Sequence, residues 1–370
     1  MVTNLPPQAE AQYKKVVASK SKEEKLENLR IFLSMIPEHK GTEKLRAQVK
    51  RQISRLQDEI LVERKRRSSR QTSFDKGDNT VLTAVLAEDK RLLHELLTRF
   101  NVFDEPLILE SLNELKPLSI GFEDIVLGFI PLPLSMVESR RYSLIQSILF
   151  KSDLILVLLN GEDQSEEFNR VKKTLRKFGI YAASKNSMAV FKSLKAGGIT
   201  VVNKSRFLSE EEIRVFLSRH GFESGIVHLS EFTSLYTLES CIIGLQRKNF
   251  LLVLKNHMSG SDLANQLNVP ESSIISVKEF LESNPLNTVF EASELIRVYL
   301  KPPSAPLPSK KPMLVNREIT VEELASKIHG GLSESIRYAR LWRGGFKSTP
   351  LRVNPSFKLL DRDVIEIRTR

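Results

Sequence analysis

Hydrophobic residues in the first seventy positions recur at helical spacing. From Leu45 to Ile60 the apolar positions lie three or four residues apart, which places them on one face of a helix. Ser21 and Glu24 have the spacing of a capping box and predict the start of an earlier helix, and Pro37 separates the two. The first seventy residues are therefore predicted to form a helical hairpin.

From about residue 71 the pattern changes to short apolar runs that alternate with amphipathic segments, which is typical of α/β folds. Three of these runs, Ile125–Ile130, Leu154–Leu159 and Phe250–Leu254, are apolar throughout, as strands of a parallel sheet buried on both faces are. The helices expected between and after them are Glu166–Phe178, Ser209–His220 and Tyr236–Lys248.

A proline-rich segment, residues 300–312, is predicted to be a linker. Beyond it, Thr320 and Glu323 form a second capping box ahead of a short helix. Strands are expected before that helix and, after it, at Arg337–Arg343 and Val364–Arg368. This order predicts a ubiquitin-like β-grasp.

Charge is distributed unevenly along the chain. The net charge is +11 in total, but residues 1–70 hold 17 Lys and Arg against 9 Asp and Glu, and residues 298–370 hold 14 against 7. The residues between them carry 25 positive and 29 negative side chains. Basic ends around a slightly acidic middle favour two contacts with a polyanion over lysines that only aid solubility.

The composition excludes several classes of protein. Cys241 is the one cysteine, so internal disulfides and cysteine metal clusters are excluded. The six histidines show no metal-ligand spacing, so no metal is expected. No run of eighteen apolar residues occurs, and the first residues lack the apolar core of a secretion signal. A cytoplasmic protein without membrane contact is expected.

Cations and aromatics concentrate at two places that suit nucleic acid. The predicted helix of the first module ends in a dense basic run, for which a solvated helix end is the alternative interpretation. In the last module arginines alternate with Tyr338 and Trp342, which either stack on bases or belong to the core. The candidate nucleic-acid-binding residues are Lys14, Lys15, Arg64, Lys65, Arg66, Arg67, Arg70, Arg337, Arg340, Trp342, Arg343 and Lys347.

The segment Thr72–Thr83 (TSFDKGDNTVLT) has the outline of a phosphate-binding loop without its cation. Such a loop needs a glycine turn, a lysine for the phosphates and a Ser or Thr for magnesium. Gly77 supplies the turn, but Asp78 occupies the lysine position and Asn79 the hydroxyl position. A carboxylate repels a triphosphate, so the pattern predicts that nucleotide binding is lost.

Several segments resemble the developmentally regulated GTP-binding (DRG) branch of the Obg-related GTPases. They are SKEEKLENLRIFLSMIPEHKGTEKLRAQVKRQISRLQDEI, FKSDLILVLLN, LKAGGITVVNKSRFLSEEEIRVFLSRHGF, and ELIRVYLKPP with TVEELASKIH and RYARLWR. The resemblance implies an α/β fold: a P-loop GTPase-like parallel sheet with a small α/β insert, a preceding helical hairpin and a C-terminal β-grasp TGS domain. TGS domains are associated with contact to RNA and the ribosome.

The resemblance also implies the division of the chain. The expected parts are the basic hairpin (1–70), the GTPase-like domain (71–180 and 236–299), the insert (181–235), the linker (300–312) and the TGS domain (313–370).

When the sequence is compared with the family's motifs, the positions that recognise the nucleotide carry other residues. The first glycine of the phosphate loop falls on Thr72, and the Asp-x-x-Gly motif falls near Pro131–Leu134, which has neither residue. The Asn-Lys-x-Asp motif falls on Asn256–Ser259, which lacks the final Asp that accepts from guanine. The predicted degenerate nucleotide site consists of Thr72, Gly77, Asp78, Asn79, Asn256, His257 and Ser259. Neither a cofactor nor catalysis is expected.

These features predict a ribosome-associated pseudo-GTPase. It would bind rRNA or a ribosomal subunit, with its ribosomal proteins, through the hairpin and the TGS domain, and act as a translation-inhibiting or hibernation factor. One alternative is an interaction scaffold that holds a partner protein of the kind expected for the DRG branch. Another is an active GTPase with a deviant loop.

Overall fold

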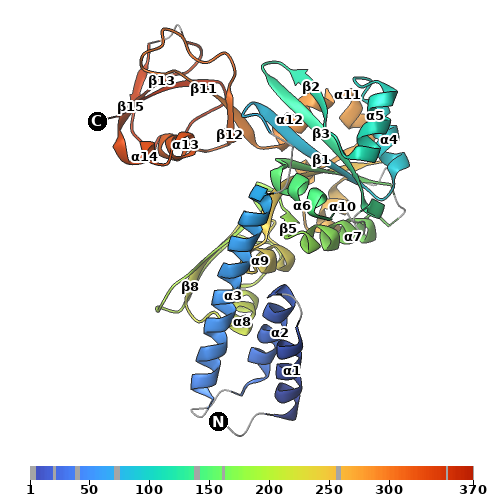
Figure 1. Ribbon diagram of the computed structural model, residues 1–370, viewed down its shortest axis with the longest axis vertical. Helices are drawn as coiled ribbons and strands as arrows, with labels where there is room; N and C mark the ends of the chain where they lie inside the picture. Colours follow the sequence, from blue (N-terminus) through green and yellow to red (C-terminus); the bar gives the residue numbers. More distant parts are fainter. Residues whose placement is uncertain are drawn as a thin grey trace. The chain divides into compact units, whose positions relative to one another are not determined.

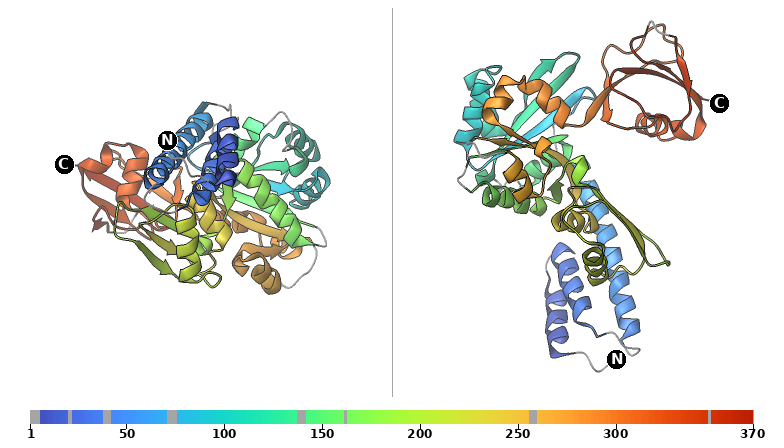
Figure 2. Two further views of the ribbon diagram at one scale, coloured as in Figure 1. Left: turned by 90° about the horizontal axis from the view of Figure 1, so that it is seen from below. Right: turned by 180° about the vertical axis from the view of Figure 1, so that it is seen from behind.

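A computed structural model describes residues 6–19, 22–37, 42–70, 76–136, 142–160, 163–255, 260–346 and 349–369 (Figure 1). The chain divides into two compact units. The first comprises residues 1–72, 175–247 and 264–270, and the second comprises residues 73–174, 248–263 and 271–370. Figure 2 shows the elements of each unit from two further sides.

The amino-terminal part of the first unit is helical. Its helices are α1 (Pro7–Ala18), α2 (Lys22–Met35) and α3 (Glu43–Arg70). Val49 and Ile53, at the predicted helical spacing on α3, pack into a core with apolar residues of α1 and α2. The hydroxyl of Thr42 donates to the carbonyl oxygen of Pro37 at 2.6 Å and closes the turn before α3. The two predicted helices, α2 and α3, and the break between them are confirmed, but α1 makes this part three helices and not a hairpin. Ser21 of the predicted capping box lies outside the described residues.

The other part of this unit is a small α/β insert. Its strands β6 (Ala189–Ser193), β7 (Ile199–Asn203) and β8 (Gly225–Leu229) form a sheet in the order β6-β8-β7. Helices α8 (Glu210–Arg219) and α9 (Leu235–Ile242) accompany it. Ser209 and Glu212 form a capping box that begins α8, so the helix predicted there is confirmed.

The helix predicted over Tyr236–Lys248 is too long. It ends as α9 at Ile242, because Gly244 takes a φ of 73° that helical backbone does not adopt. The chain then enters strand β9 (Gln246–Leu254), which contains the strand predicted at Phe250–Leu254.

The second unit is built on a mostly parallel sheet. Its strands are β1 (Thr80–Ala87), β2 (Leu118–Phe122), β3 (Ile125–Pro133), β4 (Leu154–Leu159), β9 and β10 (Ile274–Ser276). They lie in the order β10-β9-β4-β1-β3-β2, and β5 (Ile180–Ala182) pairs with β9. Neighbours along this order are parallel, except that β2 runs antiparallel to β3. The predicted parallel sheet is confirmed.

Helices cover the sheet. They are α4 (Lys90–Arg99), α5 (Glu105–Glu114), α6 (Tyr142–Lys151), α7 (Gln164–Lys177), α10 (Gly260–Leu267), α11 (Val277–Glu282) and α12 (Pro285–Ala292). Val81 and Val85 of β1 pack with residues of α4 and α5. Phe168 of α7 stacks on Phe250 of β9, with ring centroids 5.9 Å apart. Burial on both faces explains why these strands are apolar throughout.

A second sheet in this unit has the predicted β-grasp form. Its strands are β11 (Leu295–Leu300), β12 (Met313–Asn316), β13 (Ile336–Trp342), β14 (Leu351–Val353) and β15 (Asp363–Thr369), in the order β12-β11-β15-β13-β14. Helices α13 (Val321–Ile328) and α14 (Leu332–Ser335) complete it, and α13 begins at the predicted capping box of Thr320 and Glu323.

The boundary of the β-grasp lies earlier than predicted. Strand β11 precedes the proline-rich segment 300–312 and pairs with both β12 and β15. The segment is therefore a loop between two paired strands of one sheet, not a linker between domains. Its prolines indicate that the backbone leaves the sheet there, which a local pattern cannot distinguish from a domain boundary.

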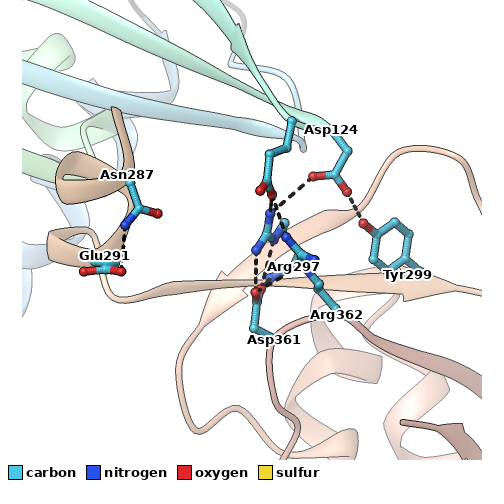
Figure 3. A network of polar contacts seen from close by, with 8 residues as sticks. Asp124, Asn287, Glu291, Arg297, Tyr299, Asp361 and Arg362 are labelled. Carbon is cyan, nitrogen blue, oxygen red and sulfur yellow. Dashed lines mark hydrogen bonds and ion pairs between the residues drawn. The ribbon is translucent and has the colours of Figure 1, made fainter. Parts of the chain in front are cut away.

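A buried arginine joins the two sheets of this unit (Figure 3). The guanidinium of Arg297, on β11, is 7% exposed and donates from Nη2 to Asp361 Oδ2 at 2.6 Å. It also pairs with Glu123, and its Nη1 lies 3.6 Å from Asp124 Oδ1, both in the turn between β2 and β3. The hydroxyl of Tyr299 donates to Asp124. Charged hydrogen bonds thus fix the β-grasp sheet to the β2–β3 turn.

No helix in the part of the chain that the structure describes has the length and apolar character needed to cross a lipid bilayer.

Candidate functional site

The predicted phosphate loop lies at the wrong end of its strand. Gly77, Asp78 and Asn79 come directly before β1, and Thr72 lies outside the described residues. The amide of Thr80 donates to the carbonyl oxygen of Gly77 at 3.0 Å, so this segment is a turn that leads into the sheet. Ligands of parallel α/β sheets bind at the carboxyl ends of the strands. The placement is therefore corrected: Asp78 does not occupy a phosphate-binding position.

Ion pairs give this turn a structural role. Lys76 Nζ donates to both carboxylate oxygens of Asp153, at 2.5 and 2.6 Å. Asp153 also accepts from the amide of Leu82 at 2.8 Å. The carbonyl oxygen of Asp78 accepts from the amide of Leu314 at 3.0 Å. The mostly apolar residues from Val81 to Ala87 indicate a buried strand. The interpretation as a phosphate loop joined the start of this strand to the polar turn before it.

At the carboxyl end of β1 the chain turns directly into α4. Two residues, Glu88 and Asp89, separate Ala87 from Lys90, the first residue of the helix. Asp89 caps α4 by accepting from the amide of Leu92 at 3.0 Å. Glu88 accepts from Arg170 Nε at 2.8 Å. Both carboxylates of this turn therefore have partners, and the start of α4 presents its positive dipole end at the sheet edge.

Two lysines lie at this edge. Lys90 Nζ donates to Asn113 Oδ1 at 3.1 Å. Lys255 follows the end of β9, and its Nζ donates to Glu95 Oε2 at 2.6 Å. Sequence reasoning missed both, because it placed the phosphate site before β1.

The two other predicted motifs lie at or after the carboxyl ends of strands of this sheet. Pro131–Leu134 spans the end of β3 and supplies no carboxylate, as expected. The residues Asn256, His257 and Ser259 lie outside the described residues. Ser276, at the end of β10, caps α11 by accepting from the amide of Glu279 at 3.1 Å.

The part of the chain that the structure describes contains no metal site built from protein carboxylates, histidines or cysteines alone. Magnesium takes oxygen ligands in octahedral geometry, commonly carboxylates. Within the described ranges, no group of three or more His, Cys, Asp or Glu side chains is placed to hold a metal. No role of these residues in nucleotide binding is assigned to a magnesium ion.

The candidate nucleic-acid residues of the hairpin lie on two helices. Lys14 and Lys15 are exposed on α1. The basic run forms the last turns of α3, where the structure describes the backbone and not the side chains. Its residues are Arg64, Lys65, Arg66, Arg67 and Arg70.

The outer face of the β-grasp sheet carries the second cationic group. Glu366, on the central strand β15, is buried there and accepts from Lys301 and from Arg368 Nε, the latter at 2.6 Å. Arg340 Nη1 lies 3.6 Å from the same carboxylate. Burial would raise the pKa of Glu366, but Lys301 and Arg368 outweigh it and hold that pKa below its usual range. One carboxylate is thus surrounded by three cations.

An arginine and a tyrosine continue this face. Arg352, on the edge strand β14, is paired in register with Arg340 and lies 4.1 Å from the centroid of the Tyr338 ring. Sequence reasoning found Arg340 and missed Lys301, Arg352 and Arg368. Only the strand register shows that they share a face with Arg340.

Two predicted residues have structural roles instead. Trp342 is 7% exposed and is covered by Phe346, with ring centroids 5.1 Å apart, so it does not offer a face to a base. Arg343 donates from Nε and Nη2 to buried Asp363, at 2.9 and 2.7 Å. Arg337 is exposed on β13, and Lys347 lies outside the described residues. Of the two interpretations of Trp342, base stacking or a place in the core, the structure favours the core.

Comparison with known proteins finds one matching domain family and several similar proteins. The family model of the TGS domain matches residues 296–369. A Dictyostelium discoideum protein named developmentally-regulated GTP-binding protein 2 homolog is 23% identical and aligns with 93% of this chain and 98% of its own length. The developmentally-regulated G-protein 2 of Arabidopsis thaliana is 25% identical over 58% of this chain and 56% of its own length.

One further relative and one solved structure are also similar to this chain. GTP-binding protein 1 of Schizosaccharomyces pombe is 21% identical over 59% of this chain and 62% of its own length. Among solved structures, the Schizosaccharomyces pombe YchF GTPase covers 80% of this chain and 99% of its own, at 10% identity and a TM-score of 0.34.

The prediction of a catalytically dead protein is contradicted. Relatives that align along most of the chain are named GTP-binding proteins. The carboxylate on which that prediction depended, Asp78, lies at the opposite end of β1 from the ligand-binding edge. The chain is thus similar over most of its length to a protein named a developmentally-regulated GTP-binding protein, and its residues 296–369 match the TGS domain.

Proposed function

We propose that this protein is a DRG-type GTPase that acts in translation, binding guanine nucleotide at the carboxyl edge of the central sheet and RNA of the ribosome through its basic modules. The observation that carries the proposal is the relative named as a GTP-binding protein, whose alignment covers 93% of this chain and 98% of its own. The parallel sheet with a helix directly after β1 supports the proposed nucleotide edge.

The start of α4 is the proposed phosphate contact. A helix amino terminus presents backbone amides and the positive end of its dipole to an anion. Lys90 begins this helix and adds a full positive charge. The charge of Glu88 is offset by its pair with Arg170, and Asp89 accepts a hydrogen bond from the amide of Leu92. Lys90 is therefore the residue on which the affinity for nucleotide depends.

Replacing Lys90 by alanine is expected to weaken binding of fluorescent GTP and GDP analogues by about 10- to 100-fold. A hydrogen bond to a charged group contributes about 1.5–3 kcal/mol, and each 1.4 kcal/mol is about tenfold in affinity. The measurement is a fluorescence titration of the full chain with magnesium present, accompanied by an assay of phosphate release from GTP.

Arg99→Ala is the matched control. Arg99 is a cation at the other end of α4, where it pairs with Glu95. Its removal is expected to leave nucleotide affinity unchanged within about twofold, because exposed helix pairs contribute little. Absence of any GTP or GDP binding by the unmodified protein would contradict the proposed nucleotide site, and equal losses in the two variants would contradict the role of Lys90.

The outer face of the β-grasp sheet is the proposed RNA contact of the TGS domain. Lys301, Arg340 and Arg368 place three cations around the carboxylate of Glu366, and Arg352 lies beside Arg340 on the next strand. Tyr338 adds an aromatic ring between strands that carry arginine. Cations that follow a phosphate backbone together with an aromatic platform are typical of RNA-binding sheets. The partner is a ribosome or a ribosomal subunit.

Reversing the charges of Arg340 and Arg352 to Glu is expected to weaken binding to purified ribosomal subunits by at least about tenfold at low salt. Each lost phosphate contact also lowers the slope of log affinity against log salt by about 0.7–0.9. Co-sedimentation at several salt concentrations measures both quantities. The control reverses Lys310 and Arg317, exposed cations of the same domain that do not lie on this sheet face; an equal effect of the control would contradict the proposed surface.

A further inference from the structure

The insert's sheet has one face that no element of the insert covers. On the inner face, Val227 and Leu229 of β8 pack with Ile213 and Leu217 of α8. Leu238 of α9 joins the same core. Because side chains alternate along a strand, the remaining positions of β6, β7 and β8 face away from both helices. The sheet is therefore packed on one side, and its outer side is the surface considered below.

Strand register places apolar residues side by side on this outer face. Val190 of β6 lies opposite His228 of β8, and His228 lies opposite Val202 of β7. In the next row, Ile226 lies between Lys192 and Thr200. Val190 is 45% exposed and Val202 is 39% exposed, although both are β-branched strand residues in ordered pairs. Val190, Ile226 and Val202 thus place aliphatic side chains around His228 on a face that is open to solvent.

The polar residues of the face are cationic or neutral. Lys192 lies beside Ile226, and Lys204 directly follows β7. The outward positions from 188 to 194, 198 to 204 and 224 to 230 are all described, and none of them is Asp or Glu. Within the described part of the chain, neither lysine takes part in an ion pair. This apolar surface has a lysine at two of its corners. Its charge is therefore complementary to that of an acidic partner.

We propose that this face docks an amphipathic α-helix of a partner protein, with carboxylates on both sides of its apolar stripe. Strands lie about 4.8 Å apart, so three strands present a width close to the ~10 Å diameter of a helix. A helix of about three turns spans the five-residue strands, since a strand rises about 3.3 Å per residue. Val190, Ile226 and Val202 would meet the apolar stripe, and Lys192 and Lys204 its carboxylates.

The same features argue against RNA as the occupant of this face. Among the outward positions of these three strands, all described, the imidazole of His228 is the one aromatic ring, and aliphatic Val190 and Val202 flank it. Contact between aliphatic side chains and a phosphate backbone adds no favourable binding free energy. The outer face of the β-grasp sheet differs, since it has Tyr338 and three cations around Glu366.

The test uses the full chain and a synthetic helical peptide of about four turns. The peptide carries Leu at positions i, i+3, i+4 and i+7 and Glu on the flanking positions. A second peptide has Lys in place of every Glu. The acidic peptide is expected to bind at least about tenfold more tightly than the basic one, because like charges placed together at an interface cost several kcal/mol. Fluorescence anisotropy of the labelled peptides measures both affinities.

Variants locate the binding. Val190→Glu and Val202→Glu are each expected to weaken binding of the acidic peptide at least about tenfold, since a carboxylate enters the apolar contact. Val215→Glu, at a valine that is 44% exposed on α8, is the matched control and is expected to leave binding unchanged. The double variant K192E/K204E is expected to reverse the preference between the two peptides. Circular dichroism checks that each variant stays folded.

Several outcomes would overturn the proposal. One is equal affinity for the two peptides, and another is an equal loss in the Val215→Glu control. A third is a dimer of this chain that Val202→Glu dissociates, which would make a second copy the occupant. A fourth is an rRNA fragment whose binding Val190→Glu and Lys192→Glu weaken while the acidic peptide does not bind.

Discussion

Replacing Arg297 by alanine is expected to lower the free energy of unfolding by about 3–5 kcal/mol, the usual cost of removing one partner of a buried ion pair. Its guanidinium is 7% exposed and holds Asp361 through Nε at 3.1 Å and Nη2 at 2.6 Å. It also lies 4.9 Å from the centroid of the Phe290 ring. Removing it leaves carboxylates near the interface of the two sheets without their cation.

Arg362→Ala is the control for this prediction, because Arg362 contacts the same network from outside. Its Nη2 lies 2.8 Å from Glu123 Oε2, but its side chain is 60% exposed. Exposed pairs contribute about 0–1 kcal/mol, so this variant is expected to unfold almost as the unmodified protein does. Urea unfolding followed by circular dichroism compares the two variants. Losses of similar size would show that burial of Arg297 does not set the energy of the network.

The same network makes stability depend on pH. Burial would raise the pKa of Asp361, but the hydrogen bonds from Arg297 outweigh it and hold that pKa below its usual range. A carboxyl group with a lowered folded pKa stabilises the protein above its unfolded pKa, and this contribution is lost as the pH falls through the folded pKa. In the Arg297→Ala variant this acid-dependent loss is expected to be smaller, which unfolding measurements below pH 5 would detect.

Reversing Arg64, Lys65, Arg66 and Arg67 to Glu is expected to reduce ribosome binding at low salt by about a thousandfold or more. Proteins that make 6–10 phosphate contacts lose about 10³–10⁵ in affinity when salt alone screens those contacts. Charge reversal removes four attractions and adds four repulsions. The salt dependence of whatever binding is left should be correspondingly shallower. Co-sedimentation with purified subunits between low and physiological salt tests this.

A variant with the same net charge separates a local contact from general attraction. It reverses four exposed cations on other elements, Lys173, Lys195, Arg219 and Lys310. Because the basic run lies at the end of α3 and these residues do not, we expect the control to retain most of its binding. If both variants lose binding equally, the basic run of α3 is not the contact, and only the net charge of the chain matters.

Local patterns were sufficient for some elements of this protein. Leu154–Leu159 is the buried strand that its apolar residues predict, because a strand covered on both faces must be apolar at every position. Thr320 and Glu323 begin α13, since capping depends on residues only three positions apart. These features are decided within a few residues, so one sequence without structure is enough to find them.

Pairings between distant segments were decided only by the tertiary structure. Glu366 and Arg340 are neighbours because β15 and β13 pair in one particular register, and no local pattern specifies that register. Likewise, the proline-rich segment 300–312 resembles a domain linker, and only the pairing of β11 with β15 shows that it lies inside one sheet.

The amino-acid sequence by itself determined the order of the modules, several of the strands and helices within them, and the basic character of both ends, because periodicity and charge are properties of neighbouring residues. The tertiary structure decided that Asp78 precedes β1 and that Lys90 and Lys255 stand at the carboxyl edge instead. Which end of a strand meets a ligand follows from the direction of its neighbours in the sheet, and those neighbours come from remote parts of the chain.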